Sequence, residues 1–188
     1  MLAATFPTAT LPTATLLGPS SSTTSAEAVH LVQAQEARRV EAFGDRLDVL
    51  LSSAQTGGAL AVAFGTVPPH HGPPPHVHHR EAEVMVVLEG ALEFSAGAEV
   101  GRTWTRVAAG GAAFLPRGVA HTFRNPEDTA TRTLIVALPG GFEEFFAGCA
   151  EVFAAAEQGA SPDMAAILRV ADAHGIEFLV PLGAPPAA

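Results

Sequence analysis

Lysine and tyrosine are absent from the 188-residue chain, and all ten basic residues are arginine. The absence of lysine excludes a Schiff-base lysine and a P-loop lysine, and the absence of tyrosine excludes a tyrosyl acid. The single cysteine, Cys149, excludes an intrachain disulfide and a multi-cysteine zinc or iron–sulfur site. One cysteine also favours a reducing compartment, so we expect a cytoplasmic protein. Chemistry is therefore left mainly to eight histidines and the carboxylates.

Positive charge and long apolar runs are scarce. Ten arginines stand against nineteen Asp and Glu, for a net charge of −9, which argues against a nucleic-acid partner. No uninterrupted apolar run reaches the roughly 18–20 residues that cross a bilayer, so we expect no membrane partner. Hydrophobic residues make up 48% of the chain and its mean hydropathy is +0.27, which is enough for a packed core.

The first 26 residues carry no charge and are rich in Ala, Thr, Pro and Ser. Pro7 and Pro12 interrupt the apolar core that a secretory signal would need. We expect residues 1–26 to form either a flexible tail or an arm that packs on a neighbouring subunit.

Short apolar segments closed by Gly or Pro follow one another at intervals of 8–12 residues, as in an antiparallel sandwich or barrel. The proline-rich segment 68–75 predicts an irregular loop, and residues 27–39 do not decide between helix and strand. We place one β-domain at 27–140. Its expected strands are 46–53, 59–67, 83–89, 91–96, 102–108, 114–116, 120–125 and 131–138.

Residues 141–188 predict a helical extension. Four phenylalanines and Cys149 lie on one face of an amphipathic helix at 142–158. Ser161 is the expected N-cap of a second helix that stops at Gly175, and residues 176–180 are a possible final strand.

Five histidines lie within residues 70–79. On a strand, His76 and His78 point to the same face and can share one cation. Glu83 begins the next apolar run, and His121 follows the pattern G-x5-P-x-G-x2-H-x3-N over 110–125. Three imidazoles and one carboxylate suit a divalent first-row metal with two positions left open. The alternatives are a solvated histidine-rich loop and a core histidine at 121.

These two patterns resemble the motifs of the cupin superfamily. In the first motif, G-x5-H-x-H-x3,4-E-x6-G, the leading Gly is replaced by His70, and we expect Gly72 to form the turn instead. The second motif matches at every position. The closest resemblance is to bacterial monocupins described as quercetin-2,3-dioxygenase-like, which share PPPHVHHRE, PRGVAHTFRN and PGGFEEFF. The resemblance covers roughly residues 38–140.

The resemblance implies an all-β cupin fold, a small antiparallel barrel or jelly roll with one metal ion inside. It implies His76, His78, Glu83 and His121 as ligands of one divalent transition metal (Fe, Mn, Ni, Co, Cu or Zn), with Glu83 also acting as the catalytic base. By strand parity we expect His79 to face outward.

Strand parity also predicts the lining of a substrate pocket. The residues expected to point inward are Met85, Val87, Leu92, Phe94, Phe114 and Phe123. Either these side chains simply fill the barrel, or they bind an apolar or aromatic small molecule that carries a hydroxyl and a carbonyl group.

Three functions follow as hypotheses. The first is an O2-dependent dioxygenase of a flavonol-like or polyketide-type substrate. The second is a non-redox cyclase, isomerase or lyase that uses the metal as a Lewis acid. The third is a small-molecule-binding cupin without enzymatic activity. The Phe-rich helix 142–158 and the N-terminal arm also offer apolar surface, so we expect a homodimer.

Overall fold

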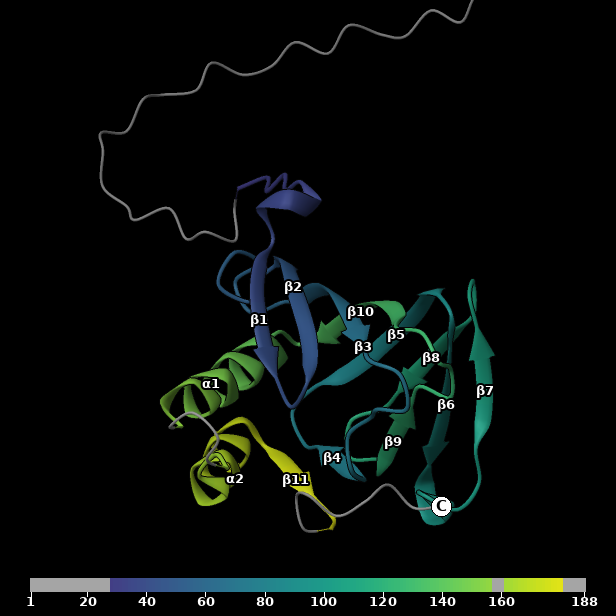
Figure 1. Ribbon diagram of the computed structural model, residues 1–188. Coiled ribbons are helices and arrows are strands. Elements are labelled where there is room, and N and C mark those ends of the chain that lie inside the picture. Colours follow the sequence, from purple (N-terminus) through teal and green to yellow (C-terminus); the bar gives the residue numbers. More distant parts are fainter. Residues whose placement is uncertain (1–27, 157–160, 181–188) are drawn as a thin grey trace, which may run out of the picture.

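The computed structural model describes residues 28–156 and 161–180, which form two antiparallel sheets with two helices on one side (Figure 1). The strands of these described residues are β1 Arg38–Ala42, β2 Asp45–Leu51, β3 Ala61–Val67, β4 His76–His78, β5 Ala82–Glu89, β6 Ala91–Ala96, β7 Thr105–Ala108, β8 Ala112–Leu115, β9 His121–Arg124, β10 Thr131–Leu138 and β11 Ile176–Phe178. Short 3-10 turns lie at Ala34–Glu36 and Gly97–Glu99.

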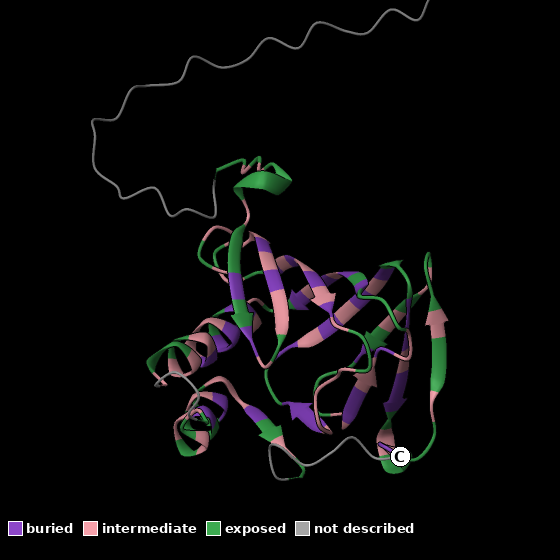
Figure 2. Ribbon diagram, viewed as in Figure 1, coloured by how far each residue is buried: buried purple, intermediate pink, exposed green. Residues whose placement is uncertain are grey.

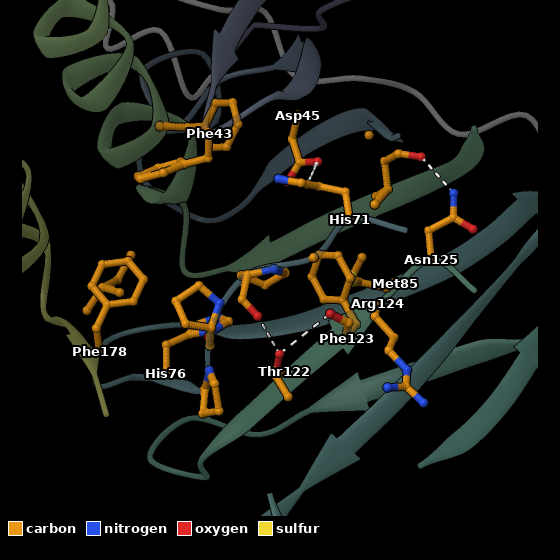
Figure 3. A pocket seen from close by; sticks show the side chains of 18 of the residues that line it. Phe43, Asp45, His71, His76, Met85, Thr122, Phe123, Arg124, Asn125 and Phe178 are labelled. Atoms are coloured by element: carbon orange, nitrogen blue, oxygen red, sulfur yellow. Dashed lines mark hydrogen bonds and ion pairs between the residues drawn. The ribbon is translucent and has the colours of Figure 1, made fainter. Parts of the chain in front are cut away.

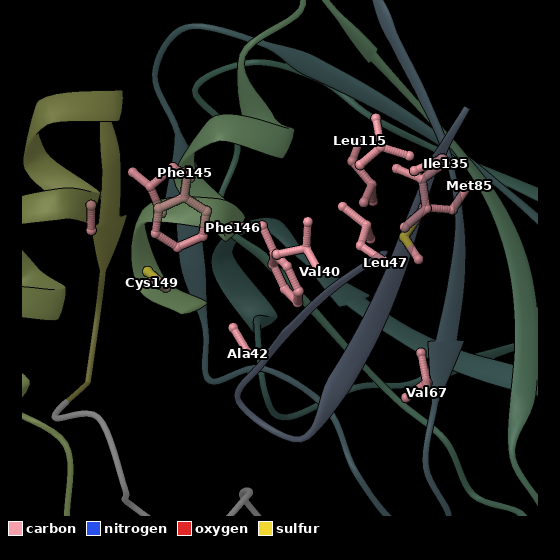
Figure 4. Packing of buried hydrophobic residues seen from close by; sticks show 14 of the residues in the cluster. Val40, Ala42, Leu47, Val67, Met85, Leu115, Ile135, Phe145, Phe146 and Cys149 are labelled. Atoms are coloured by element: carbon pink, nitrogen blue, oxygen red, sulfur yellow. The ribbon is translucent and has the colours of Figure 1, made fainter. Parts of the chain in front are cut away.

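The larger sheet, sheet A, has six strands in the order β1-β2-β3-β10-β5-β8. Side chains alternate between the two faces of each strand, and Figure 2 shows buried and partly exposed residues alternating along them. The inward face of sheet A contributes Leu47, Met85 and Ile135 to the hydrophobic core (Figure 4).

The smaller sheet, sheet B, has the order β11-β4-β9-β6-β7. Strand β4 pairs with β9 at His76 and His121, which brings the two histidine motifs side by side. On its other side β4 pairs with β11, so the C-terminal extension adds a strand next to the His76–His78 pair.

Helix α1, Phe142–Ala155, turns its apolar face into its own chain. Phe145, Phe146 and Cys149 are buried and belong to the same core as the strands (Figure 4). The carboxylate of the buried Glu143 accepts hydrogen bonds from the backbone N–H groups of Ser53 and Gly141, which ties the start of α1 to the loop after β2. The aromatic face that we expected to offer a dimer contact is therefore used within the chain.

Helix α2, Met164–His174, begins two residues later than expected. Its N-cap is Asp163, whose side chain accepts from the backbone N–H groups of Ala165 and Ala166, so the expected cap at Ser161 is wrong. The helix ends at Gly175, which adopts the left-handed conformation expected of a C-terminal glycine.

The expected fold class is confirmed: two β-sheets carry two helices near the C-terminus. Strand β1 was not anticipated, because the charged sequence at 38–41 shows only part of an alternation. The expected tail at 1–26 lies outside the described residues, and the boundaries at 27 and 141 stay predictions. Within the described residues, no helix has the length and apolarity needed to span a membrane.

Candidate metal centre

Three histidines meet on the inner face of sheet B. His76 and His78 come from β4 and His121 from β9, and one ring nitrogen of each lies within 4.8 Å of the others. The ring centroids of His76 and His121 are 4.5 Å apart, and all three side chains are buried. Strand alternation and the β4–β9 register together therefore bring three imidazoles close enough to share one ion.

The Nδ1 atom of each imidazole is already held by a hydrogen bond. His76 Nδ1 donates to the carbonyl oxygen of Pro74 and His121 Nδ1 to that of Val119, both at 2.9 Å. A carbonyl oxygen can only accept, so these hydrogen bonds assign the proton to Nδ1 and leave Nε2 with a free lone pair. A neutral imidazole with a bare Nε2 is the form that binds a metal.

Glu83, on β5, faces this cluster. Its Oε2 lies 3.9 Å from Nε2 of His78 and 3.8 Å from Nε2 of His121, which is too long for a hydrogen bond. The Nε2 atom of His121 is buried and has no hydrogen-bond partner among the described residues. An orphaned buried nitrogen costs free energy unless another group satisfies it. A divalent cation between these atoms would satisfy it, so the donor set fits a metal ion.

The environment shifts the pKa of each histidine. Burial lowers the pKa of His76 well below its ordinary value, and the neighbouring His78 and His121 lower it further. Burial likewise lowers the pKa of His121. Burial also acts to lower the pKa of His78, but Glu83 and Glu81 outweigh it and raise that pKa. His76 and His121 are thus held as neutral imidazoles, the form that a metal requires.

Sequence reasoning missed a buried carboxylate beside the cluster. Glu81 is 4% exposed, and its Oε1 lies 2.9 Å from Nδ1 of His78. A carboxylate in this position orients the imidazole ring and makes its Nε2 more electron-rich. Alternation could have indicated this residue, because Glu81 lies two residues before Glu83 and therefore faces the same side.

His76, His78 and Glu83 line a cavity of about 1080 Å³. Figure 3 shows His76 and Phe178 near one end of it, with Met85, Phe123 and Arg124 farther along. Apolar side chains that line the cavity come from both sheets, from the turn between β1 and β2 and from the C-terminal extension. They include Phe43, Leu47, Met85, Phe123, Ile135, Phe142, Phe145, Phe146, Phe153, Met164, Ile176 and Phe178.

Met85 and Phe123 line this cavity, in agreement with their expected direction. Val87, Leu92 and Phe94 point inward as expected and are buried in the core, but they are not among the residues that line the cavity. The register gives the reason. Val87 lies four residues beyond Glu83 on β5, and Leu92 lies four residues from the residue that pairs with His121, so both are about 13 Å along the strand from the cluster.

Phe114 is also a wrong expectation, because it points out of the barrel and is 64% exposed. On β8 it is Leu115 that pairs with Glu83 and faces the core. The expected strand began at Phe114, so no alternating residues before it indicated which face of the sheet it takes.

The loop before β4 differs from the expectation. His70, which stands where the cupin motif has Gly, adopts a positive φ of 54°, so the left-handed turn residue is His70 rather than Gly72. Gly72 is needed for a different reason, since a Cβ there would meet the carbonyl oxygen of Phe123 at 2.1 Å. His79 is half-exposed and pairs with Glu177, which agrees with its expected outward direction.

Two aromatic rings from the C-terminal extension contact the histidines. The Phe178 ring on β11 lies 6.1 Å from that of His76, and the Phe142 ring on α1 lies 5.5 Å from that of His78. The sequence marked Phe142 as part of an apolar helix face but could not place it against a histidine 64 residues earlier. The extension therefore forms part of the wall of the site.

Comparisons with known proteins agree with this geometry. Residues 63–137 match the family model described as the cupin domain. The chain is 33% identical over 98 residues to germin-like protein 1-1 from Oryza sativa subsp. japonica, a match that covers 52% of this chain and 45% of that protein. The chain thus spans less than half the length of the curated relatives it matches.

Two solved structures have similar folds. KdgF from a Halomonas species is 15% identical, with a TM-score of 0.53 over 62% of this chain and 99% of its own. The polyketide cyclase RemF from Streptomyces resistomycificus is 25% identical, with a TM-score of 0.50 over 59% of this chain and 80% of its own. With the motif match and the two-sheet fold, these findings identify residues 63–137 as a cupin domain.

Proposed function

We propose that the protein is a metal-dependent enzyme acting on an apolar aromatic or polyketide-type small molecule that chelates the ion through hydroxyl and carbonyl oxygens. The observation that carries this proposal is a group of three buried imidazoles, with His121 Nε2 unsatisfied, two of which line an apolar cavity of about 1080 Å³. A drug-sized apolar ligand fits a cavity of this size.

His76, His78, His121 and Glu83 would hold the ion. Three nitrogens and one carboxylate oxygen accept Fe, Mn, Ni, Co, Cu or Zn, and the order of affinities does not select among them. Bound there, the ion supplies Lewis acidity that favours the deprotonated form of a substrate hydroxyl.

Glu83 is the best candidate for the base. Three carboxylates line the cavity among the described residues: Asp45, Glu83 and Glu93. Asp45 is paired with His71 and Glu93 with Arg124, both within 2.9 Å. Only Glu83 faces the imidazole nitrogens without a hydrogen bond, so it can take a proton from a substrate hydroxyl held near the cluster.

The aromatic wall would bind and orient the substrate. Phe142 and Phe178 lie against the histidines, and Phe123 comes from the same strand as His121. Flat apolar side chains favour a planar aromatic substrate and exclude water from the reacting atoms. A sugar phosphate would need free cationic donors, and two of the three arginines that line the cavity are already paired with carboxylates.

Two reactions are compatible with such a site. The quercetinase-like motifs favour a dioxygenase, which adds O2 to the bound substrate and cleaves a carbon–carbon bond. The likeness to the polyketide cyclase RemF favours a cyclisation that needs no O2. The two share the metal, the base and the apolar pocket, and they differ in whether oxygen is consumed. A cupin that only binds its ligand is the third outcome.

The test is turnover by protein loaded with each metal in turn. Flavonols and linear aromatic polyketides are offered, and oxygen uptake and product mass are recorded together. Oxygen uptake with both atoms of labelled O2 recovered in the products identifies a dioxygenase, whereas loss of water without uptake identifies a cyclase. Binding without any product supports the non-enzymatic role. A protein that retains no metal after loading would contradict the proposal.

A further inference from the structure

We propose that the cavity contains a second binding site, which lies on the other face of sheet B from the three histidines and binds an aromatic carboxylate through Arg102 and Trp104. This inference does not depend on the proposed function, because it needs neither the metal ion nor turnover. The site is built from the segment that leads into β7 and from the outer side chains of β6 and β9.

Strand alternation places this part of the cavity. On β9, His121 belongs to the metal cluster and Arg124 lies three residues further on, so its side chain leaves the opposite face of the sheet. Figure 3 shows the guanidinium of Arg124 pointing away from His76. Both Arg124 and His76 line the cavity, which therefore reaches both faces of sheet B.

Arg102 lacks a carboxylate partner among the described residues. Seven of the ten arginines form an ion pair with a carboxylate. The other three are Arg80, Arg102 and Arg117, and of these only Arg102 is among the described residues that line the cavity. The chain carries a net charge of −9, so an unpaired guanidinium on a cavity wall is a position that the negative charge of a ligand can occupy.

Trp104 supplies a second donor. Its Nε1 is buried and has no hydrogen-bond partner in the part of the chain that the structure describes. A buried donor without an acceptor costs free energy, which a bound acceptor would recover. Arg102 and Trp104 are two residues apart, so their Cα atoms lie within about 7 Å of each other. The two oxygens of one carboxylate can therefore accept from both side chains.

The neighbouring charges leave this end of the cavity positive. Cζ of Arg124 lies 4.1 Å from the centre of the Trp104 ring, and Nε of Arg124 donates to Glu93 at 2.8 Å. The other two carboxylates of the cavity lining, Asp45 and Glu83, belong to strands of sheet A. Two guanidinium groups thus stand against one carboxylate on this face, which favours an anion over a neutral molecule or a cation.

Flat apolar surfaces beside these donors favour an aromatic ring next to the carboxylate. Trp104, Pro73 and Val100 line the cavity here. Pro73 lies on this face of β9, because its carbonyl oxygen accepts from the hydroxyl of Thr122, which has the same parity as Arg124. Aromatic rings pack against indole rings and against the plane of a guanidinium. An aryl carboxylate therefore matches both the charge and the shape of the site.

Trp104 is the only tryptophan of the chain, so its fluorescence reports binding at this site. The probe is benzoate. Benzamide has the same shape without the charge, and cyclohexanecarboxylate has the charge without the aromatic ring. Each is titrated into the metal-free protein, because a carboxylate would otherwise bind a metal ion directly, and the emission is excited where none of the three absorbs.

The variant to test is Arg102→Gln, and its matched control is Arg117→Gln. Both substitutions remove an exposed arginine without a described carboxylate partner, but Arg117 is not among the residues that line the cavity. The unfolding temperature of each metal-free protein is recorded as a check of folding. Arg102→Lys keeps the charge and serves if the glutamine variant misfolds, since it should still prefer benzoate to benzamide.

We expect benzoate to change the Trp104 emission saturably, with benzamide binding at least about tenfold and cyclohexanecarboxylate at least about threefold more weakly. Arg102→Gln should weaken benzoate binding by about tenfold or more, and Arg117→Gln should leave it within about twofold. Equal binding of benzoate and benzamide, equal losses in the two glutamine variants, or no saturable change in emission would overturn the proposal. These results are obtained without metal, so they leave the proposed function to its own test.

Discussion

Replacing Glu81 by glutamine should weaken metal binding without removing any ligand of the ion. Glu81 Oε1 lies 2.9 Å from Nδ1 of His78, and the two side chains are 5% and 2% exposed. The carboxylate attracts the Nδ1 proton more strongly once the opposite nitrogen binds a cation, because the cation polarises the ring. The glutamine oxygen can still accept this hydrogen bond, so the substitution changes the charge and largely keeps the geometry.

The size of the effect follows from the charge that is lost. A buried hydrogen bond to a charged group is worth about 1.5–3 kcal/mol, and a neutral acceptor supplies roughly half of that. The difference is about 1–2 kcal/mol, or about a 5- to 30-fold weaker affinity for the metal. Loss of a carboxylate behind a metal-bound histidine generally weakens binding by about 10- to 100-fold, which overlaps this range.

The affinity is measured by competition between the protein and a coloured chelator for zinc. The matched control is Glu177→Gln, since Glu177 pairs with His79 at the same 2.9 Å but on the surface, where the two side chains are 59% and 51% exposed. Unfolding of the metal-free proteins is recorded as well, so that a disordered site is recognised. Equal zinc affinities for the two variants would show that Glu81 has no role in orienting His78.

Three further outcomes are expected. His78→Ala should lose most of the bound metal. Because metal binding stabilises the native state by mass action, the variant should also lose the rise in unfolding temperature that added metal causes. A variant with unchanged metal content would rule out His78 as a ligand. Burial raises the pKa of the Cys149 thiol to about 12, so iodoacetamide should label it only after denaturation, and labelling of the native protein would contradict its burial. The hydrogen bond to Asp45 raises the pKa of His71, so this pair should add up to about 1 kcal/mol to the free energy of unfolding below about pH 6.5. That contribution should disappear as the pH rises through the raised pKa of His71. Urea unfolding of Asp45→Asn should therefore differ from wild type at low pH and converge with it at high pH, and a constant difference would refute the assignment.

Strand alternation explains how much of the site could be predicted. It put His76 and His78 on one face, and the second motif supplied His121, which the β4–β9 register then brought opposite His76. Alternation predicts which face of the sheet a side chain takes, but it does not predict how far along the strand that side chain lies from the histidines. Val87 and Leu92 point inward as expected, but both lie about 13 Å along their strands from the histidines and neither lines the cavity.

Other residues depend on contacts that no local pattern encodes. Phe178 reaches His76 because β11 pairs with β4 across about a hundred residues of sequence, and Phe142 reaches His78 through the packing of α1. Asp163 rather than Ser161 caps α2, since both residue types cap helices and the local backbone decides between them. Glu143, buried and bonded to two backbone N–H groups, reads in the sequence as an ordinary acidic residue of the first helical turn.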